Sequence, residues 1–483
     1  MIRIPANFLL QFFYARLLGP ANFGVFDYVL NASNKIIAFF DGGSSKAFFV
    51  KLSEDNQTSI YSLYFFLLSL FLLTLNVVFL VVFQVLPAFF PGNSLVEVLL
   101  ITNLASVLYF LSAVYNSLDA VNRTVYLEKV KIALIVFTLT AFFIVYLTIE
   151  NFGITKFVSL HLFINVMALI FVSYKQKIFK RIYRNLASSI CKENFIYLAS
   201  FVKPLLVYSF VTTLIPIFER WLLHFFNDSV ELGYFAIAFK LAALVLVFTS
   251  AFIPLFGRQL SILNSLNKTS EIAHLYLSTQ KRLLVLTGSF SILVANFSQE
   301  LISAVGGNVY KEATPVLHVM SFYPVAQTLW QINGSYFYST KRVSTYSNIG
   351  IVTSPISFLL IWVFIAPKDL FGMNLGALGL ALTYILYTFS VVQIQQYYIS
   401  KHVGLSWKTL AGFQITVLAF LFSINHVTQI YVTIGFLPQF GQKLFSSLLF
   451  VVIVFLLVIK RSNFFLNISL MEIKKIVKNR LWK

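Results

Sequence analysis

The chain has few charged residues and almost no cysteine, and both shortages restrict what it can be. Only 11% of its 483 residues are Asp, Glu, Lys or Arg, whereas about 25% are charged in a typical soluble domain. The only cysteine is Cys191, which excludes an internal disulfide framework and a cysteine metal cluster. The six histidines are scattered without a metal-ligand spacing, so we expect no metal site and no cofactor.

Long polar segments are also missing. The sequence is 59% hydrophobic, includes 54 Phe and has a mean hydropathy of +0.83, and apolar stretches long enough to cross a bilayer recur from end to end. The pattern predicts an all-α polytopic membrane protein with no room for an appended catalytic domain. The N-terminus runs into the first apolar stretch without a small-residue cleavage site, so we predict no cleavable signal peptide.

The apolar windows predict fourteen transmembrane helices. They lie near residues 1–15, 24–50, 58–86, 95–118, 130–150, 155–174, 197–225, 231–257, 283–303, 313–339, 344–366, 373–399, 411–432 and 439–459.

Lysine and arginine outside these spans lie mostly in alternate loops. Twenty-six are on the side that holds both ends of the chain, and five are on the other side. By the positive-inside rule, both termini are predicted to be cytoplasmic. Most of the formal charge of +19 therefore reflects topology, and we expect no nucleic-acid partner.

When the other charged residues near the span ends are counted with the loops, eight charged residues remain within the predicted spans. Five are basic and three are acidic: Lys35, Lys46, Lys203, Arg220 and Lys240, with Asp27, Asp41 and Glu219. A charged side chain at the bilayer centre costs roughly 3 kcal/mol on insertion scales. We therefore expect these residues to face a water-filled cavity or a partner.

The span 24–50 concentrates its polar residues on one face. Asp27, Asn31, Asn34 and Lys35 lie along one helical stripe. Lys35 lies about 17 Å into the span at 1.5 Å per residue, near the midplane. The stripe favours a helix that lines a cavity. An alternative is that Asp27, Asp41 and Lys46 only reach the membrane interfaces or pair with one another.

The later spans contain a comparable helix, in which Lys240 lies about 14 Å from the start. Aligning "GVF" at 24–26 with "GYF" at 233–235 requires an offset that sets Lys240 opposite Asn31, one turn from Lys35. Many transporters are built from two such repeated halves with the substrate site between them.

Two motifs resemble a known family. They are "ARLLGPANFGVFDYV" at 15–29 and "FERWLLHFFNDSVELGYFAIAFKL" at 218–241. With the span count, they make the chain similar to the polysaccharide flippases of the multidrug/oligosaccharidyl-lipid/polysaccharide exporter (MOP) superfamily. The resemblance implies two pseudo-symmetric six-helix lobes around a central cavity, at 1–174 and 197–399. A basic linker at 175–196, two additional helices at 411–459 and a basic cytoplasmic tail at 460–483 complete the expected organisation.

The resemblance also implies an activity. Such proteins move undecaprenyl-diphosphate-linked oligosaccharide from the cytoplasmic to the outer leaflet of the bacterial cytoplasmic (inner) membrane, for O-antigen, capsule or similar glycans. It implies alternating access of the two lobes, H⁺ or Na⁺ as the coupling ion, and polysaccharide polymerase proteins as partners.

The basic residues within the spans suit a diphosphate. A cation within about 4 Å supplies up to roughly 4 kcal/mol before desolvation is subtracted. We expect Lys35, Lys240, Arg220, Lys46 and Lys203 to bind the cargo's diphosphate. We expect Asp27, Asn31, Asn34 and Glu219 to be polar cavity or ion-coupling residues. For Glu219, beside Arg220, a structural ion pair and a coupling-ion site are both open interpretations.

Sugars need amides and aromatic faces, and the span 313–339 supplies both. We expect Gln327, Trp330, Gln331 and Asn333 to contact the sugars, although ordinary membrane packing would also account for each of them. The tail 460–483 has an apolar face and a basic face, which is typical of an amphipathic helix on anionic membrane lipids; a solvated tail is the open alternative.

Two other functions compete with the flippase. A multi-span polymerase or glycosyltransferase needs a sizeable outer loop or an acidic catalytic motif, yet the predicted outer loops are short and the first, 16–23, has no acid. We therefore predict no catalytic residue and no enzyme activity. A cation-coupled multidrug exporter of the same superfamily is disfavoured only by the excess of basic over acidic residues in the spans.

Overall fold

The computed structural model describes residues 3–42, 44–55, 58–90, 94–120, 123–149, 152–175, 195–196, 198, 206–250, 252–431 and 438–460. Within these ranges the regular structure is helical and contains no strand, which confirms the predicted all-α class. Lys203 and nearly all of the predicted linker 175–196 and tail 460–483 lie outside the described residues, and so does the side chain of Lys46.

Each of the fourteen predicted spans coincides with a helix or with a broken helix. In the described part of the chain, eight helices are long and apolar enough to cross a membrane. A ninth is added if α14 (Thr269–Asn296) and α15 (Ser298–Val305), bent by 69°, form one broken span. The helices rich in polar residues, such as α1 (Arg3–Asp41), do not meet this test.

The helices form two compact units. The first unit comprises Met1–Ala236 with two short segments, Val305–Tyr310 and Ile365–Ala377, and the second unit holds the rest. The division falls inside α11 (Ser229–Ala243). The helix α10 (Leu206–Phe226), expected at the start of the second lobe, packs against α1 in the first unit.

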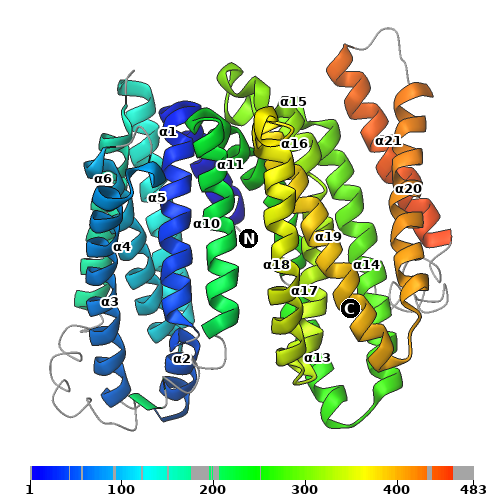
Figure 1. Cartoon of the computed structure of the whole chain (residues 1–483), viewed down its shortest axis with the longest axis horizontal. Helices are drawn as coiled ribbons and strands as arrows, with labels where there is room; N and C mark the ends of the chain where they lie inside the picture. The colour runs from blue at the N-terminus through cyan, green and yellow to red at the C-terminus, as the bar shows by residue number, and fades with distance from the viewer. Residues whose placement is uncertain are drawn as a thin grey trace. The chain divides into compact units, whose positions relative to one another are not determined.

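In the first unit, α1 is the central helix and packs against α4, α5, α6 and α10 (Figure 1). It is kinked at Gly19, whose φ of 67° lies in the left-handed region that glycine tolerates. Pro20 follows, and proline fits the first turn of a helix because it has no N–H to leave unpaired. The predicted turn between spans 1–15 and 24–50 is this kink. The other helices are α2 (Ser44–Asp55), α3 (Thr58–Val85), η1 (Pro87–Phe89), α4 (Leu95–Ala120), α5 (Thr124–Thr148) and α6 (Ile154–Lys175).

Aromatic residues fill the interior around α1. The rings of Phe142 and Phe157 stack with centroids 4.9 Å apart, and Tyr14 packs edge-on against both. The Tyr14 hydroxyl and His161 Nε2 lie 3.3 Å apart in a hydrogen bond. His161 is buried here, so its role is to pack the core of the first unit.

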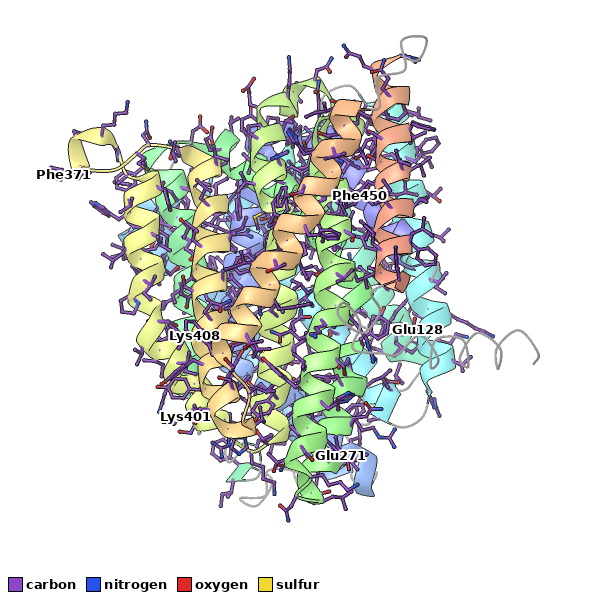
Figure 2. All side chains as sticks on the ribbon, turned by 90° about the vertical axis from the view of Figure 1, so that its right-hand side faces the viewer. Glu128, Glu271, Phe371, Lys401, Lys408 and Phe450 are labelled. Carbon is purple, nitrogen blue, oxygen red and sulfur yellow. The ribbon has the colours of Figure 1, made fainter. Side chains whose placement is uncertain are left out.

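The second unit is built around α14 and α17 (Tyr323–Ser339), which pack against each other and against α13 (Phe252–Ser265). One apolar cluster joins α14, α17, α19 (Gly376–Val403), α20 (Trp407–Tyr431) and α21 (Gln439–Lys460). Phe450, labelled in Figure 2, brings α21 into this cluster, so the two last helices pack onto the second unit. The remaining elements of this unit are α12 (Leu246–Ser250), α16 (Thr314–Met320) and α18 (Val343–Ile365). The division between the units falls inside η3 (Asn308–Ala313), and η4 (Lys368–Leu370) belongs to the first unit.

Candidate functional site

A buried ion pair joins α1 to α10 in the first unit. The guanidinium of Arg220 donates to the carboxylate of Asp27. Both residues are buried, with 4% and 8% of their surface exposed. The guanidinium also lies 5.6 Å from the ring centroid of Phe235 on α11, in a cation–π contact. Because two opposite charges share this site, neither is left uncompensated in the membrane interior.

Two more predicted residues lie at the same place. Glu219 is 4% exposed, and the charges of Glu219 and Arg220 both act on half-buried Lys35. The hydroxyl of Thr213 donates to the backbone carbonyl of Lys35 over 3.3 Å, which ties α10 to α1 beside them. We call Asp27, Lys35, Glu219 and Arg220 the charge cluster. Its formal charge is zero, because two acids face two bases.

The helical spacing of α1 explains this arrangement. Asp27, Asn31 and Lys35 are four residues apart, so they share one face of the helix. Asn31 and Lys35 are half-buried, whereas Asn34 is exposed. The predicted polar stripe thus turns its Asp27 end inward against α10 and leaves Asn34 at the surface of the first unit.

The second expected lysine, Lys240, lies on α11. It is half-buried and belongs to the part of α11 that is in the second unit.

Asp41 has a local role at the end of α1. Its carboxylate accepts hydrogen bonds from the Ser44 hydroxyl at 2.9 Å and from the Ser45 N–H at 3.0 Å. Gly42 has a φ of 48°, so the chain turns here and starts the new helix α2. Asp41 therefore caps α2, a function that acidic and hydroxyl side chains commonly serve at helix N-termini.

The expected sugar contacts lie on α17, where several already have protein partners. Asn333 is fully buried; it accepts from the Tyr276 hydroxyl at 2.6 Å and donates to Gln395 at 3.1 Å. These bonds give Asn333 a packing role, one of the two interpretations that the sequence left open. The Trp330 indole N–H donates to the Tyr346 hydroxyl over 2.7 Å.

The other two expected sugar contacts, Gln327 and Gln331, are half-buried. Gln327 accepts from the Tyr323 hydroxyl at 3.1 Å. Its amide nitrogen can still donate elsewhere, because an amide has two donor hydrogens as well as its oxygen.

Two charged residues outside the predicted set hold helix ends in the first unit. Arg16 Nε donates to the carbonyl of Val305, the last residue of α15, over 3.2 Å. Glu231 Oε2 accepts from the N–H of Ala377, at the start of α19, over 2.6 Å. A cation thus meets a helix C-terminus and an anion meets a helix N-terminus, the favourable arrangement for the helix dipole. The only sequence signal was that Arg16 belongs to the "ARLLGP" motif.

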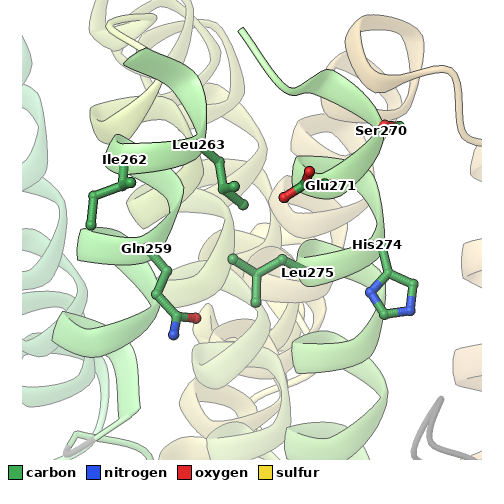
Figure 3. A pocket seen from close by; sticks show the side chains of 7 residues that line it. All are labelled: Gln259, Ile262, Leu263, Ser270, Glu271, His274 and Leu275. Atoms are coloured by element: carbon green, nitrogen blue, oxygen red, sulfur yellow. The ribbon is translucent and has the colours of Figure 1, made fainter. Parts of the chain in front are cut away.

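Among the described residues of the second unit, we consider two pockets that the sequence did not reveal. One, of about 490 Å³, lies between α13 and α14. Leu263 from α13 and Glu271 and Leu275 from α14 point into it (Figure 3). Glu271 is also paired with Lys268, with 2.7 Å between nitrogen and oxygen. The other pocket, of about 360 Å³, involves the two last helices. Across the described residues, no group of three or more His, Cys, Asp or Glu could hold a metal ion.

Comparisons with known proteins identify the fold. No protein-family model matches the sequence, and no curated protein sequence matches it. Among solved structures, an inward-facing multidrug resistance MATE family transporter of the MOP superfamily is 12% identical, with a TM-score of 0.65 over 83% of this chain and 94% of that chain. The lipid II flippase MurJ, in an inward closed conformation, is 13% identical, with a TM-score of 0.65 over 94% of this chain and 98% of that chain.

A MOP superfamily transporter from Pyrococcus furiosus is also similar, at 12% identity and a TM-score of 0.58 over 83% of this chain and 92% of that chain. At these identities the similarities establish the fold alone. The chain therefore has the fold of MOP superfamily transporters and is a multi-pass membrane protein.

Proposed function

We propose that the chain is a flippase for undecaprenyl-diphosphate-linked oligosaccharide in the bacterial cytoplasmic membrane, and that it supplies the synthesis of O-antigen, capsule or a similar glycan. The observation that carries this proposal is Lys35, a lysine held deep in a MOP fold beside a buried pair in which Asp27 compensates Arg220. A lysine at this depth is costly unless an anion meets it. Glu219 offsets part of this cost, and we propose that the cargo's diphosphate offsets more of it when the cargo is bound.

The charge cluster refines the expected roles. Because Asp27 compensates the charge of Arg220, we assign Arg220 a structural role. We assign binding of the diphosphate to Lys35 and Lys240. Lys46 and Lys203 stay predicted additional contacts. We propose Glu219 as the site of the coupling ion, H⁺ or Na⁺, because it is a buried carboxylate beside Lys35. The sugars are assigned to Gln327, Trp330 and Gln331, whose side chains are not fully buried.

The extent of the similarity to MurJ supports a lipid-linked cargo. That comparison covers 94% of this chain, against 83% for the MATE transporter. The remaining steps of the proposal follow the transporter fold: two lobes alternate in exposing the site, polymerase proteins receive the flipped units, and the basic tail binds anionic lipids.

Multidrug export is the second candidate, because the MATE transporter has the same TM-score of 0.65. A cationic drug would be repelled by Lys35 and would need a net acidic site, whereas the charge cluster has no excess of acid. Since the structural neighbours are transporters, we do not propose the polymerase or glycosyltransferase.

The test is complementation of a strain that lacks the chain. We expect Lys35→Ala and Lys240→Ala each to abolish surface glycan while the protein stays in the membrane. The exposed Lys311 provides the control, Lys311→Ala, which should leave the glycan normal. Normal glycan from the Lys35→Ala/Lys240→Ala double variant would overturn the cationic mechanism. Loss of drug resistance with unchanged glycan would favour the exporter.

A further inference from the structure

A polar pocket of about 360 Å³ lies in the second unit where the two last helices meet its core. The ends of α14, α15 and α16 form one wall, and α20 and α21 form the other. Figure 1 shows α15 and α16 at the same end of the unit as the start of α21. The distribution of basic loops predicts that this end faces outward.

Four amides line this pocket, and three of them link its two walls. Asn296 on α14 donates to Asn425 on α20 at 2.7 Å, and Asn425 donates back at 3.2 Å. Gln429 donates to the Asn296 oxygen at 2.9 Å. Each amide has two donor hydrogens and two acceptor lone pairs, so the three retain hydrogen-bonding capacity beyond these contacts.

Two residues of α16 add further polar atoms. His318 Nδ1 lies 3.2 Å from the carbonyl oxygen of Ala295. A carbonyl only accepts, so Nδ1 is the donor in this contact, and Nε2 is an acceptor when it carries no proton. Thr314 Oγ1 is buried and has no hydrogen-bond partner among the described residues. A buried hydroxyl without a partner is costly, and a small shift of α16 would let a ligand hydroxyl in the pocket satisfy it.

The pocket also has an apolar face and compensated charge. Phe422 lines it, and its ring stacks on Phe322 with centroids 5.0 Å apart. Lys443 pairs with Glu300, with 2.7 Å between nitrogen and oxygen, so the lysine does not make the pocket a strong anion site. Amides, two imidazoles, two hydroxyls and one aromatic face suit a neutral ligand that carries many hydroxyl groups.

We propose that this pocket is a saccharide site that holds a sugar residue of the cargo on the outward side of the transporter. Its volume falls at the lower end of the range of about 300–1,000 Å³ for small-molecule sites, which is enough for a sugar but not for a whole lipid-linked oligosaccharide. This inference rests on the proposed function, which makes the cargo the source of the sugar. It adds a second binding site along the transport path.

Photo-crosslinking of the full chain in glycan-producing cells tests the site. Benzoylphenylalanine is introduced at Phe422, inside the pocket, and as a control at Phe455, an exposed position on α21. We expect a product whose mass includes a hexose or N-acetylhexosamine from position 422, at about tenfold the yield from position 455. A phospholipid product alone, or no product at 422, would overturn the saccharide site.

A second variant separates binding from folding. Thr314→Val has the same shape and removes only the unpartnered hydroxyl. If the hydroxyl has no ligand, the thermal midpoint of unfolding rises or stays constant and the crosslink yield is unchanged, which would contradict the proposal. If a sugar binds it, the yield falls about threefold, the effect of one neutral hydrogen bond. Thr140→Val, at an exposed threonine of α5, should leave the yield unchanged.

The two proposals fail in different ways. If a sugar product forms at position 422 in cells whose surface glycan does not depend on the chain, the saccharide site is supported and the flippase function is overturned. If no sugar is crosslinked at position 422 in cells whose surface glycan does depend on the chain, the saccharide site is overturned and the flippase function is still supported.

Discussion

Gly24 on α1 and Gly233 on α11 lie in backbone contact. A Cβ atom added to Gly24 would be 2.6 Å from the nitrogen of Gly233 and 2.2 Å from the carbonyl oxygen of Ser229. A Cβ atom on Gly233 would be 2.0 Å from the carbonyl oxygen of Pro20. These are the two glycines that the sequence repeat aligns. The repeat therefore corresponds to a close approach of two helices, which only residues without a side chain permit.

Alanine at either glycine should destabilise the protein. The new methyl group would collide with backbone, which cannot move aside as a flexible side chain can, so we expect a loss of about 1–3 kcal/mol, typical of overpacking. The measurement is the thermal midpoint of the purified protein, with surface glycan as a second readout. Gly412→Ala is the control, because a Cβ atom there meets nothing within 4 Å. Equal midpoints for Gly24→Ala and Gly412→Ala would contradict the close contact.

The ion pair between Asp27 and Arg220 leads to a second prediction. Asp27→Asn leaves the buried guanidinium without its counter-charge, and breaking a buried pair from one side typically costs about 3–5 kcal/mol. We expect a large fall in the thermal midpoint for Asp27→Asn and for Arg220→Met, and a smaller fall for the double variant than the sum of the two.

The same series distinguishes the two roles of Arg220. If the residue is structural, loss of surface glycan follows loss of folded protein in the membrane. If Arg220→Met keeps a normal thermal midpoint and a normal protein level but abolishes surface glycan, Arg220 instead contacts the diphosphate directly.

Local signals predicted most of the fold, and long-range pairing accounts for what they missed. The apolar windows predicted the positions of helices or broken helices, of which eight or nine in the described part of the chain are long and apolar enough to cross a membrane, and Gly19 with Pro20 marked the kink in α1. The break at Gly42 and the capping by Asp41 were missed, because the polar run "DGGSSK" at 41–46 was interpreted as part of the polar face of one span, 24–50. The ion-pair partner of Arg220 could not be predicted from the sequence either, because Asp27 lies 193 positions away in the chain. Adjacent residues such as Glu219 and Arg220 point in different directions on a helix, so adjacency does not reveal a partner.

The expected sugar contacts show another limit of sequence. Amides and aromatic rings on one span suit both sugar binding and packing, and only the three-dimensional partners distinguish them. Asn333 packs, because Tyr276 and Gln395 use its amide. The pocket lined by Asn296 and Asn425 could not be predicted from the sequence, because these two residues lie 129 positions apart in the chain.

Glu219 gives a prediction about coupling. Glu219→Gln preserves size and most hydrogen bonding but can neither take up a proton nor balance a cation. We expect the variant to reach the membrane in normal amounts and to lower surface glycan about tenfold, or about 1.4 kcal/mol. In reconstituted vesicles, transport by the variant should no longer respond to a pH or Na⁺ gradient. A variant that keeps the response of the natural protein would exclude Glu219 as the coupling site.

Glu231 gives a prediction about the end of α19. Its carboxylate accepts from the Ala377 N–H at 2.6 Å, so Glu231→Ala removes the side-chain acceptor at this helix N-terminus, a loss worth about 1 kcal/mol in typical caps. We expect a lower thermal midpoint for Glu231→Ala and a partial recovery for Glu231→Gln, which keeps an acceptor oxygen without the charge. Asp369→Ala is the control, because Asp369 is an exposed acid in the same unit. A midpoint for Glu231→Ala equal to that of the control would show that the bond to Ala377 contributes nothing to stability.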